Sequence, residues 1–199
     1  MQEFSVAIVA GGQARRLGGV TKSALLVGGR TILTRQLDVL RELDVPALVV
    51  ADDAAAFAHT GLLVVPDRIP GAGALGGLYT ALTYAPTECV IVLACDMPFV
   101  TGPLLQHLAE HCGHADVVLP RDARGRHPLC AAYARRVAPH LRARIDAGDL
   151  RVGAALDDLV VHEVGPETLA TLDHTGRLLL NVNTPDDYAA ACADVDRTR

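Results

Sequence analysis

Residues 5–22, SVAIVAGGQARRLGGVTK, contain the pattern that decides the fold of this chain. The apolar run at residues 6–10 is typical of a strand that is buried on both faces of a parallel sheet. The loop that follows is rich in glycine, arginine and lysine. Glycine N–H groups can approach a ligand closely because no Cβ stands in the way, and the cations neutralise phosphate charge. The stretch therefore predicts a buried strand that leads into a nucleoside triphosphate site.

The glycine loop matches neither of the two common phosphate-binding motifs. The dinucleotide fingerprint GxGxxG is absent because Gly11 and Gly12 are adjacent, and GxxxxGK[ST] is absent because Lys22 follows Thr21. These absences argue against a dinucleotide-binding dehydrogenase and against a P-loop kinase. The alternative is a glycine-rich turn with solvated arginines, but turns seldom place three cations beside four glycines directly after a buried strand.

Composition restricts the class of protein. The chain has 199 residues, 50% of them hydrophobic and 4% aromatic, as expected for one α/β domain over residues 1–199. Its formal net charge of −5 argues against a nucleic-acid partner, because binding a phosphate backbone needs a broad basic face. No apolar stretch of about 18 residues and no leader pattern are present, so the sequence indicates neither a membrane span nor a signal peptide. We expect a cytoplasmic monomer.

The cysteines and histidines show no spacing that is specific for a metal. The five cysteines are scattered without a CxxC pair, which indicates reduced thiols rather than a disulfide framework. His107 and His111 are four residues apart on a predicted helix and could in principle bind zinc. The sequence shows no third ligand nearby, so a solvated helix face is the favoured interpretation.

Apolar strands and amphipathic helices alternate along the chain. Helices are predicted behind Thr31, at residues 75–84 and 103–112, after Tyr133 and from Thr184, whose hydroxyl, following proline and acids are typical of a helix start. This alternation predicts a Rossmann-like three-layer α/β/α domain with a mostly parallel sheet. The predicted strands cover residues 6–10, 47–51, 62–65, 90–94, 117–120, 129–133, 160–164 and 178–182.

The polar residues that follow these strands predict one site. Ligands of such a sheet bind beyond the carboxyl ends of the strands, where we expect Gly11, Asp67, Asp96 and Asn183. Asp96 ends a buried strand, and Mg²⁺ prefers oxygen ligands such as carboxylates and phosphates. We therefore predict that Asp96 binds Mg²⁺ and bridges it to the triphosphate, the alternative being a carboxylate that caps the following turn. Asp67 is either a nucleotide contact or an ordinary loop acid.

Motifs in one order along the chain strengthen this prediction. The loop GGQARRLGGVTK at residues 11–22 is followed by Asp67 with the GALGG turn at residues 73–77. CDMPF at residues 95–99 and NVNTPD at residues 181–186 come later. Together these motifs resemble the molybdenum cofactor guanylyltransferase family, which are nucleotidyltransferases with a glycosyltransferase-A-like fold.

The resemblance implies a reaction and a set of site residues. The terminal phosphate of molybdenum-loaded molybdopterin would attack the α-phosphate of GTP, so that GMP is transferred and pyrophosphate leaves. Transient contacts with other cofactor-biosynthesis proteins or with recipient apoenzymes are also implied. The implied residues are Arg15, Arg16, Lys22 and Asp96 for catalysis, Val9, Ala10, Gly11, Gly12, Lys22, Asp67, Gly76 and Asp96 for the nucleotide, and His127, Asn181 and Asn183 for the acceptor.

Several positions depart from the family pattern and leave alternatives open. Ala51 stands where some members carry a nucleotide-contacting asparagine, and Thr21, Leu17 and Ala74 are further departures. Asn183 could instead cap the helix at Thr184. The rival functions are a CTP-dependent cytidylyltransferase acting on the same pterin, a sugar-phosphate nucleotidyltransferase, and a non-catalytic protein that senses GTP or carries the cofactor.

Overall fold

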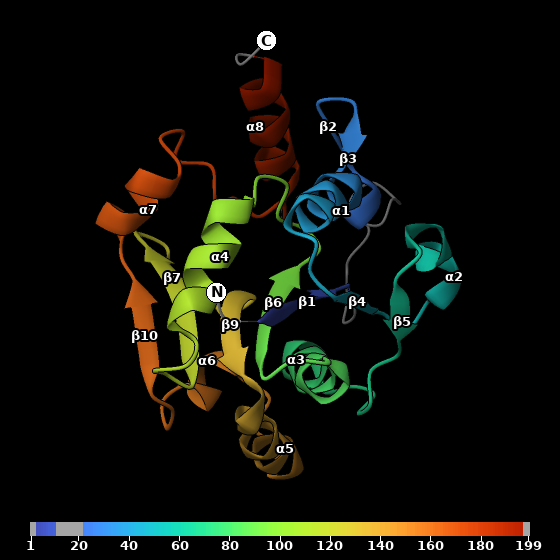
Figure 1. Ribbon diagram of the computed structural model, residues 1–199. Helices are drawn as coiled ribbons and strands as arrows, with labels where there is room; N and C mark the ends of the chain where they lie inside the picture. The colour runs from blue at the N-terminus through green and yellow to red at the C-terminus, as the bar shows by residue number, and fades with distance from the viewer. Residues whose placement is uncertain (1–2, 11–21, 197–199) are drawn as a thin grey trace.

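A computed structural model of the chain describes residues 3–10 and 22–196. Its centre is a mixed sheet with the strand order β10-β7-β9-β6-β1-β4-β5, and β8 pairs with β7 outside this path. Figure 1 shows the sheet running through the middle of the molecule with helices around it. The strands are β1 (Phe4–Val9), β4 (Ala47–Val50), β5 (Leu63–Val65), β6 (Cys89–Ala94), β7 (Val117–Asp122), β8 (Gly125–Arg126), β9 (Cys130–Ala134) and β10 (Val161–Val164).

The central part of the sheet is parallel, as predicted. In β1, Ile8 lies opposite Val49 of β4 and Leu93 of β6, and β4 pairs in parallel with β5. β9 is the exception, because it lies antiparallel between β6 and β7. The connection from β7 to β9 contains only β8 and a few loop residues. Such a short connection returns the chain beside the strand it left, which makes the pairing antiparallel.

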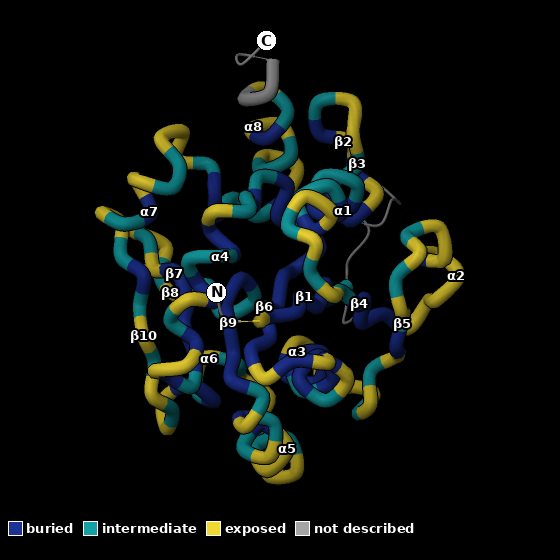
Figure 2. The backbone as a smooth tube through the Cα atoms, viewed as in Figure 1, coloured by how far each residue is buried: buried dark blue, intermediate teal, exposed yellow. Residues whose placement is uncertain are grey.

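Alternate residues of β1 face two different hydrophobic layers. Phe4, Val6 and Ile8 pack with α1 (Ile32–Leu43), α4 (Gly102–His111) and α7 (Pro166–Leu172). Ala7 and Val9 pack with the opposite layer, whose helices are α3 (Gly73–Tyr84), α5 (Ala138–Asp146) and α6 (Val152–Ala155). The inner strands are therefore buried on both faces, as the dark tube at the centre of Figure 2 shows. This arrangement confirms the three-layer α/β/α prediction and explains the unbroken apolar runs.

Local chemistry fixes where the predicted helices begin. Thr31 is the N-cap of α1, and its hydroxyl accepts a hydrogen bond of 3.0 Å from the backbone N–H of Thr34. Thr101 is the residue before α4, but its side chain does not cap the helix, because its Oγ1 is buried without a hydrogen-bond partner in the described structure. The remaining short elements are η1 (Lys22–Ala24), β2 (Leu26–Val27), β3 (Arg30–Thr31), α2 (Ala54–Phe57), η2 (Ala58–Thr60) and η3 (Arg135–Val137).

The predicted strand at residues 178–182 is wrong, because this segment forms a buried loop. Leu178, Leu179 and Val182 are buried, which explains the apolar run that resembled a strand. The backbone groups of this segment do not form a ladder with one neighbouring strand. Instead they make single hydrogen bonds to different partners; for example, the Val182 N–H donates to the carbonyl oxygen of Asp96 at 2.9 Å. A buried apolar run satisfies its polar groups equally well in a loop when side chains and turns supply the partners.

The last described helix, α8 (Pro185–Asp196), packs against the β2–β3 hairpin (Figure 1). It begins with reciprocal capping, in which the Asp187 N–H donates to Thr184 Oγ1 at 3.1 Å and the Asp187 carboxylate accepts from the N–H groups of Asn183 and Thr184. This confirms the helix start predicted at Thr184. Across residues 3–10 and 22–196, no helix has both the length and the apolar character that a membrane crossing requires.

Candidate active site

The carboxyl ends of the parallel strands form the edge at which the sequence predicts ligand binding. Val9, the last residue of β1, lies opposite Val50 of β4 and Ala94 of β6. Just beyond the strand ends, Ala10 N–H donates to Val50 O at 2.9 Å and Cys95 N–H donates to Val9 O at 3.2 Å. The chain segments that leave β1, β4 and β6 therefore start side by side.

At this edge, Lys22 lies between two predicted site residues. Its Nζ is 3.3 Å from Oδ2 of Asp96, and it donates a hydrogen bond of 2.5 Å to Oδ1 of Asn183. The side chains of Lys22 and Asp96 are only 13% and 14% exposed. Lys22 is also the only lysine in the sequence. The structure thus brings Lys22, Asp96 and Asn183 together, although they come from three distant parts of the chain.

A small hydrophobic cluster explains how Asn183 reaches Lys22. Leu25 and Val27, which follow Lys22, pack with Val182 and with Ala191 of α8. The Tyr188 hydroxyl adds a hydrogen bond of 2.8 Å to the carbonyl oxygen of Leu26. These contacts hold the start of α8 against the β2–β3 hairpin. Because Val182 is also bonded to the backbone of Asp96, the same loop positions Asn183 over the end of β6.

The electrostatics of Asp96 suit a cation ligand. Burial raises the pKa of its carboxyl group, and the nearby Lys22 ammonium opposes that rise. Oδ2 faces Lys22, whereas Oδ1 is buried and has no hydrogen-bond partner among the described residues. An unpartnered buried carboxylate oxygen is costly unless a cation or donor binds to it. A Mg²⁺ ion fits this position because it takes one or two carboxylates together with phosphate oxygens and waters.

Asp67 lies where β5 leads into α3. Burial raises the pKa of its carboxyl group, the neighbouring Asp52 carboxylate adds to the rise, and the Thr80 hydroxyl opposes it. Within the described chain, its Oδ1 is also buried without a hydrogen-bond partner. Asp67 and Asp96 therefore each have one buried carboxylate oxygen without a hydrogen-bond partner among the described residues.

The glycines of α3 allow this helix to approach the end of β1. A Cβ on Gly77 would lie 2.7 Å from Cγ1 of Val9 and 3.7 Å from Oδ1 of Asp67. A Cβ on Gly76 would instead lie 2.8 Å from Cβ of Ala72. The resemblance implies a nucleotide contact for Gly76, whereas Gly77 is the glycine that faces Asp67. The signal was present in the GALGG turn, where both positions are glycine, but only the packing distinguishes them.

Of the residues predicted to contact the acceptor, Asn181 lies near Asp96, whereas His127 lies at the β7–β8 hairpin. Asn181 is in the loop next to Asp96, and its Oδ1 is buried with no partner in the described part of the chain. His127 Nε2 lies 2.9 Å from Oδ1 of Asp122. Burial opposes ionisation of Asp122, but hydrogen bonds from His127 and Arg124 hold its pKa below the usual range. His127 thus contacts the β7–β8 hairpin, and no contact in the described structure joins it to Lys22 or Asp96.

The remaining predicted residues include several that cannot be placed. Gly11, Gly12, Arg15 and Arg16 lie outside the described residues. The Val9 side chain is buried, so a nucleotide contact through it would require repacking. The carbonyl oxygen of Val9 already accepts a hydrogen bond from the Cys95 N–H. Cys95 is buried beside Asp96, and burial raises the pKa of its thiol to about 12. It is therefore a core residue at neutral pH rather than a reactive thiolate.

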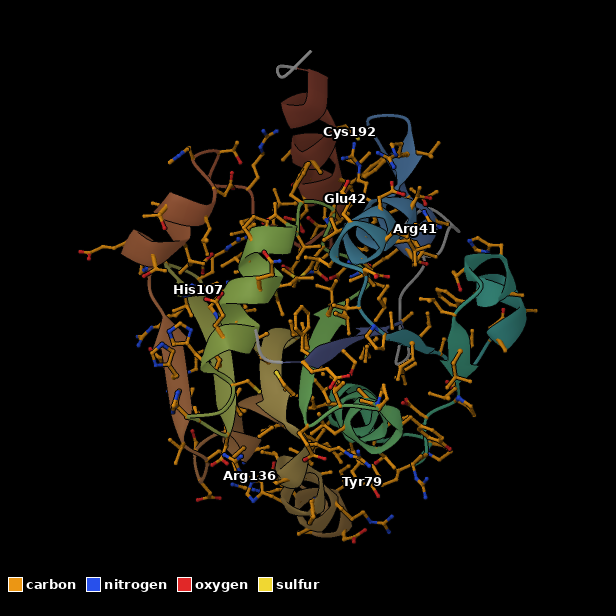
Figure 3. The ribbon with its side chains drawn as sticks, viewed as in Figure 1. Arg41, Glu42, Tyr79, His107, Arg136 and Cys192 are labelled. Atoms are coloured by element: carbon orange, nitrogen blue, oxygen red, sulfur yellow. The ribbon has the colours of Figure 1, made fainter. Side chains whose placement is uncertain are left out.

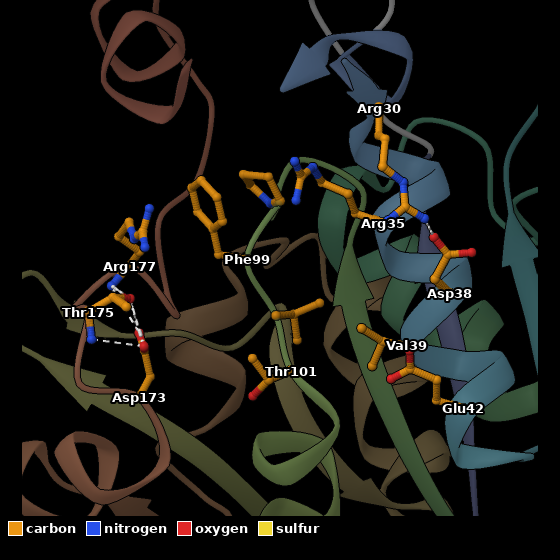
Figure 4. A pocket seen from close by; sticks show the side chains of 12 residues that line it. Arg30, Arg35, Asp38, Val39, Glu42, Phe99, Thr101, Asp173, Thr175 and Arg177 are labelled. Atoms are coloured by element: carbon orange, nitrogen blue, oxygen red, sulfur yellow. Dashed lines mark hydrogen bonds and ion pairs between the residues drawn. The ribbon is translucent and has the colours of Figure 1, made fainter. Parts of the chain in front are cut away.

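A cavity of about 420 Å³ lies beside the turn that follows Asp96, and Figure 4 shows its lining. Phe99 is one of the residues that line it, and the guanidinium carbons of Arg35 and Arg177 lie 6.0 and 5.2 Å from the centroid of the Phe99 ring. Across the cavity, Arg30 pairs with Asp38. None of the residues lining this cavity is a predicted site residue, so its volume does not mark the phosphate site.

Known proteins resemble this chain over almost its full length. A probable molybdenum cofactor guanylyltransferase of Chloroflexus aggregans is 36% identical over 185 residues, which cover 90% of this chain and 89% of that protein. Another, of Pelotomaculum thermopropionicum, is 31% identical over 199 residues, covering 100% and 97%. The crystal structure of molybdopterin-guanine dinucleotide biosynthesis protein A from Archaeoglobus fulgidus has a TM-score of 0.82 at 26% identity, covering 97% of this chain and 99% of that one.

The family assignment rests on both sequence and fold. The model of the MobA-like NTP transferase domain matches residues 6–161, which run from β1 into the start of β10. The mostly parallel sheet with helices on both faces agrees with the solved relative. On these grounds the chain belongs to the family of MobA-like NTP transferase domains and is a nucleotidyltransferase.

Proposed function

We propose that this chain transfers GMP from GTP to molybdenum-loaded molybdopterin and releases pyrophosphate. The names of the relatives from Chloroflexus aggregans and Pelotomaculum thermopropionicum support this choice of substrates. The observation that carries the proposal is the position of Lys22 at the strand ends, where it makes a partly buried contact with Asp96 and a hydrogen bond to the exposed Asn183. It combines a cation for phosphates, a carboxylate for a metal and an amide for a polar acceptor.

The proposed chemistry needs positioning and charge neutralisation rather than a general base. An oxygen of the terminal phosphate of molybdopterin attacks the α-phosphorus of GTP, and the bond between that phosphorus and the bridging oxygen to the β-phosphate breaks. Pyrophosphate leaves with the electron pair of that bond. The attacking phosphate is already anionic, so no proton has to be removed. Fixed charges that match those of the transition state then supply most of the acceleration.

Each residue of the cluster has a proposed role in this step. Lys22 binds the β- and γ-phosphates as a point charge, and Arg15 and Arg16 are proposed to assist it. Asp96 would hold Mg²⁺ through its unpartnered oxygen, and the bound ion would stabilise negative charge on the phosphates. Asn183 orients the acceptor, and its Oδ1 accepts a hydrogen bond from Lys22, which holds the Lys22 side chain between Asn183 and Asp96.

Other predicted residues have proposed binding roles. The ends of β1 and α3, with Val9, Ala10 and Gly76, would form the nucleotide side of the site together with Gly11 and Gly12. Asp67 would accept a hydrogen bond from the nucleoside through its unpartnered Oδ1. Asn181 would contact the acceptor beside Asn183, and His127 would do so from the β7–β8 hairpin.

We also propose that residues 1–199 form one nucleotidyltransferase domain that acts as a cytoplasmic monomer. The described strands of a single sheet extend from Phe4 to Val164, which supports one domain. Contacts with recipient apoenzymes or with other cofactor-biosynthesis proteins would be transient. Size-exclusion chromatography with light scattering tests the monomer, and a dimer mass at micromolar concentration contradicts it.

The decisive experiment supplies purified chain with molybdenum-loaded molybdopterin, MgCl₂ and one of GTP, CTP or ATP. We expect pyrophosphate and the guanine dinucleotide product with GTP, and little product with the other nucleotides. Product mainly with CTP would contradict the proposed base and indicate a cytidylyltransferase. Magnesium-dependent GTP binding without product would contradict catalysis and indicate a GTP sensor or cofactor carrier.

A further inference from the structure

A group of side chains of the types that ligate metals lies where the carboxyl-terminal half of α4 faces the edge strand β10. His107 and His111 are on α4, and His162 is on β10. The ring centroids of His107 and His111 are 4.8 Å apart, and those of His111 and His162 are 5.0 Å apart. Figure 3 labels His107 on the face of α4 that is turned towards β10. The group shares no residue with the Lys22–Asp96–Asn183 cluster.

Glu110 of α4 adds a third side chain that can ligate a metal beside the two histidines. One ligand atom each from His107, Glu110 and His111 lies within 4.8 Å of the other two. Around a tetrahedral Zn²⁺ ion, ligand atoms are about 3.3 Å apart, given metal–ligand distances of about 2.0–2.1 Å. The two histidines are partly exposed and Glu110 is exposed, so small side-chain rotations close this gap without disturbing the core.

Hydrogen bonding prepares His111 to bind a metal. Its Nδ1 lies 3.0 Å from the carbonyl oxygen of His107. A carbonyl oxygen can only accept, so Nδ1 carries the hydrogen and Nε2 keeps a free lone pair. Metal-binding histidines typically hold their second nitrogen in this way. The His162 ring stacks on the His111 ring with only 7° between their planes, which further fixes the orientation of His111.

We propose that His107, Glu110 and His111 form a binding site for a borderline divalent transition-metal ion, with Zn²⁺ as its best-suited member. Residues four apart on a helix lie on the same face one turn apart, so one helix can chelate a metal through both imidazoles. Two imidazoles and one carboxylate match the ligand preference of Zn²⁺, whereas Mg²⁺ prefers oxygen ligands alone. Three protein ligands leave the fourth position to water.

Binding should be measured on the full-length chain without an affinity tag, after chelator treatment, in buffer with excess Mg²⁺ to occupy carboxylate sites. Zn²⁺ is titrated in competition with a chromophoric chelator. We expect one Zn²⁺ per chain, and an affinity at least about tenfold weaker in each of His107→Gln, His111→Gln and Glu110→Gln. All three positions are at the surface, so circular dichroism should show these variants folded.

Two matched controls exclude other ligands. His59→Gln removes an exposed histidine on η2, and Cys192→Ser removes the one cysteine side chain that is not buried. Both should bind Zn²⁺ as the wild-type chain does. Wild-type affinity in His107→Gln and His111→Gln, or loss of binding in either control, would overturn the proposed site.

A spectroscopic and a thermal measurement test the same site without using activity. Co²⁺ should give the visible absorption bands of a tetrahedral site in the wild-type chain and not in His107→Gln. Zn²⁺ should raise the melting temperature of the wild type reversibly, because a ligand that binds only the folded state stabilises it. An equal rise in His111→Gln would contradict the assignment. These readouts do not depend on nucleotidyl transfer, so either proposal can fail separately.

Discussion

Two charge clusters of this molecule contain similar groups but differ in how completely they are paired. Where β10 meets the β7–β8 hairpin, both oxygens of Glu163 are bound, Oε2 by Arg121 at 2.9 Å and Oε1 by Arg126 at 2.7 Å. These arginine side chains are 58% and 41% exposed. At the strand ends, Asp96 is 14% exposed, and within the described residues only Oδ2 has a partner.

The difference separates a structural pair from a binding site. Exposed, fully paired charges gain little free energy because water and salt already screen them. A buried carboxylate with a free oxygen weakens the fold unless a ligand completes its coordination. The pKa values differ accordingly: the two arginines lower the pKa of Glu163, while burial raises that of Asp96. The incompletely paired cluster is therefore the one in which we place catalysis.

Substituting the central carboxylate should give the largest effect. We expect Asp96→Asn to lower turnover of GTP to pyrophosphate by about a hundredfold or more, because the variant loses the proposed metal ligand. The folded chain holds the Asp96 proton more tightly than the unfolded chain, so ionisation of this group destabilises the fold as the pH rises above the unfolded pKa. The melting temperature at neutral pH should therefore not fall. A variant with wild-type turnover would show that Asp96 does not hold the metal.

The neighbouring cation should be nearly as sensitive. Lys22→Ala is expected to reduce turnover by about a hundredfold, because the phosphates lose a buried positive charge. Lys22→Arg should not restore it fully, since a guanidinium is a wider group than an ammonium. Because Lys22 is the only lysine, an amine-acylating reagent modifies just this side chain and the N-terminus. Mg²⁺ with GTP should protect Lys22 in peptide mass spectra, and unprotected acylation would place the phosphates elsewhere.

Asp187 tests whether positioning of Asn183 matters. Asp187→Ala removes the carboxylate that accepts from the N–H groups of Asn183 and Thr184, and should lower the free energy of unfolding by about 1 kcal/mol. The KM for the acceptor should rise more than kcat falls. Asp186→Ala, at the exposed neighbouring acid of the same turn, is the matched control. Equal kinetics in both variants would argue against a positioning role.

The stabilisation that Asp187 provides should depend on pH in one direction. Burial of Asp187 opposes ionisation, but the backbone N–H groups hold its pKa below the usual range. Its stabilising contribution is therefore present above the unfolded pKa and is lost as the pH falls through the lowered folded value. The difference in melting temperature between the wild type and Asp187→Ala should shrink below about pH 4. A difference that stays constant there would contradict this account.

The smallest effect is expected at the hairpin. Glu163→Gln, on β10 beside the hairpin, removes one carboxylate charge, as Asp96→Asn does, but from a half-buried, fully paired residue. Turnover should stay within about twofold of wild type, and the melting temperature should change by less than about 3 °C. If this variant lost activity as Asp96→Asn does, the comparison between paired and unpaired clusters would fail.

Patterns within a few residues predicted most of the fold. The apolar runs located seven strands of the main sheet, because strands buried on both faces need unbroken apolar sequence. Thr31 and Thr184 marked helix starts because capping joins groups only three residues apart. The same reasoning failed at residues 178–182. A buried loop there has the composition of a strand, and only the partners of its backbone groups distinguish the two.

The site was predictable in part. Asp67 and Asp96 were placed at the sheet edge because they follow strands, and both retain a buried unpartnered oxygen among the described residues. Asn183 was expected there after a strand that does not exist. It reaches the edge through the loop that bonds to Asp96 and through the packing of α8 on the β2–β3 hairpin. Only packing and distance show that Gly77 faces Asp67 and that Glu110 lies close to His107 and His111.

The sequence by itself determined the alternation of strands and helices, the two-sided burial of the central strands and the helix caps. Each of these depends on periodicity or hydrogen bonds within a few residues. Tertiary structure decided that Lys22 meets Asp96 and Asn183, which are 74 and 161 residues further along the chain. That contact depends on which distant apolar side chains bury one another, as Leu25 and Val182 do. Local pattern does not encode that choice, because apolar side chains attract one another without direction.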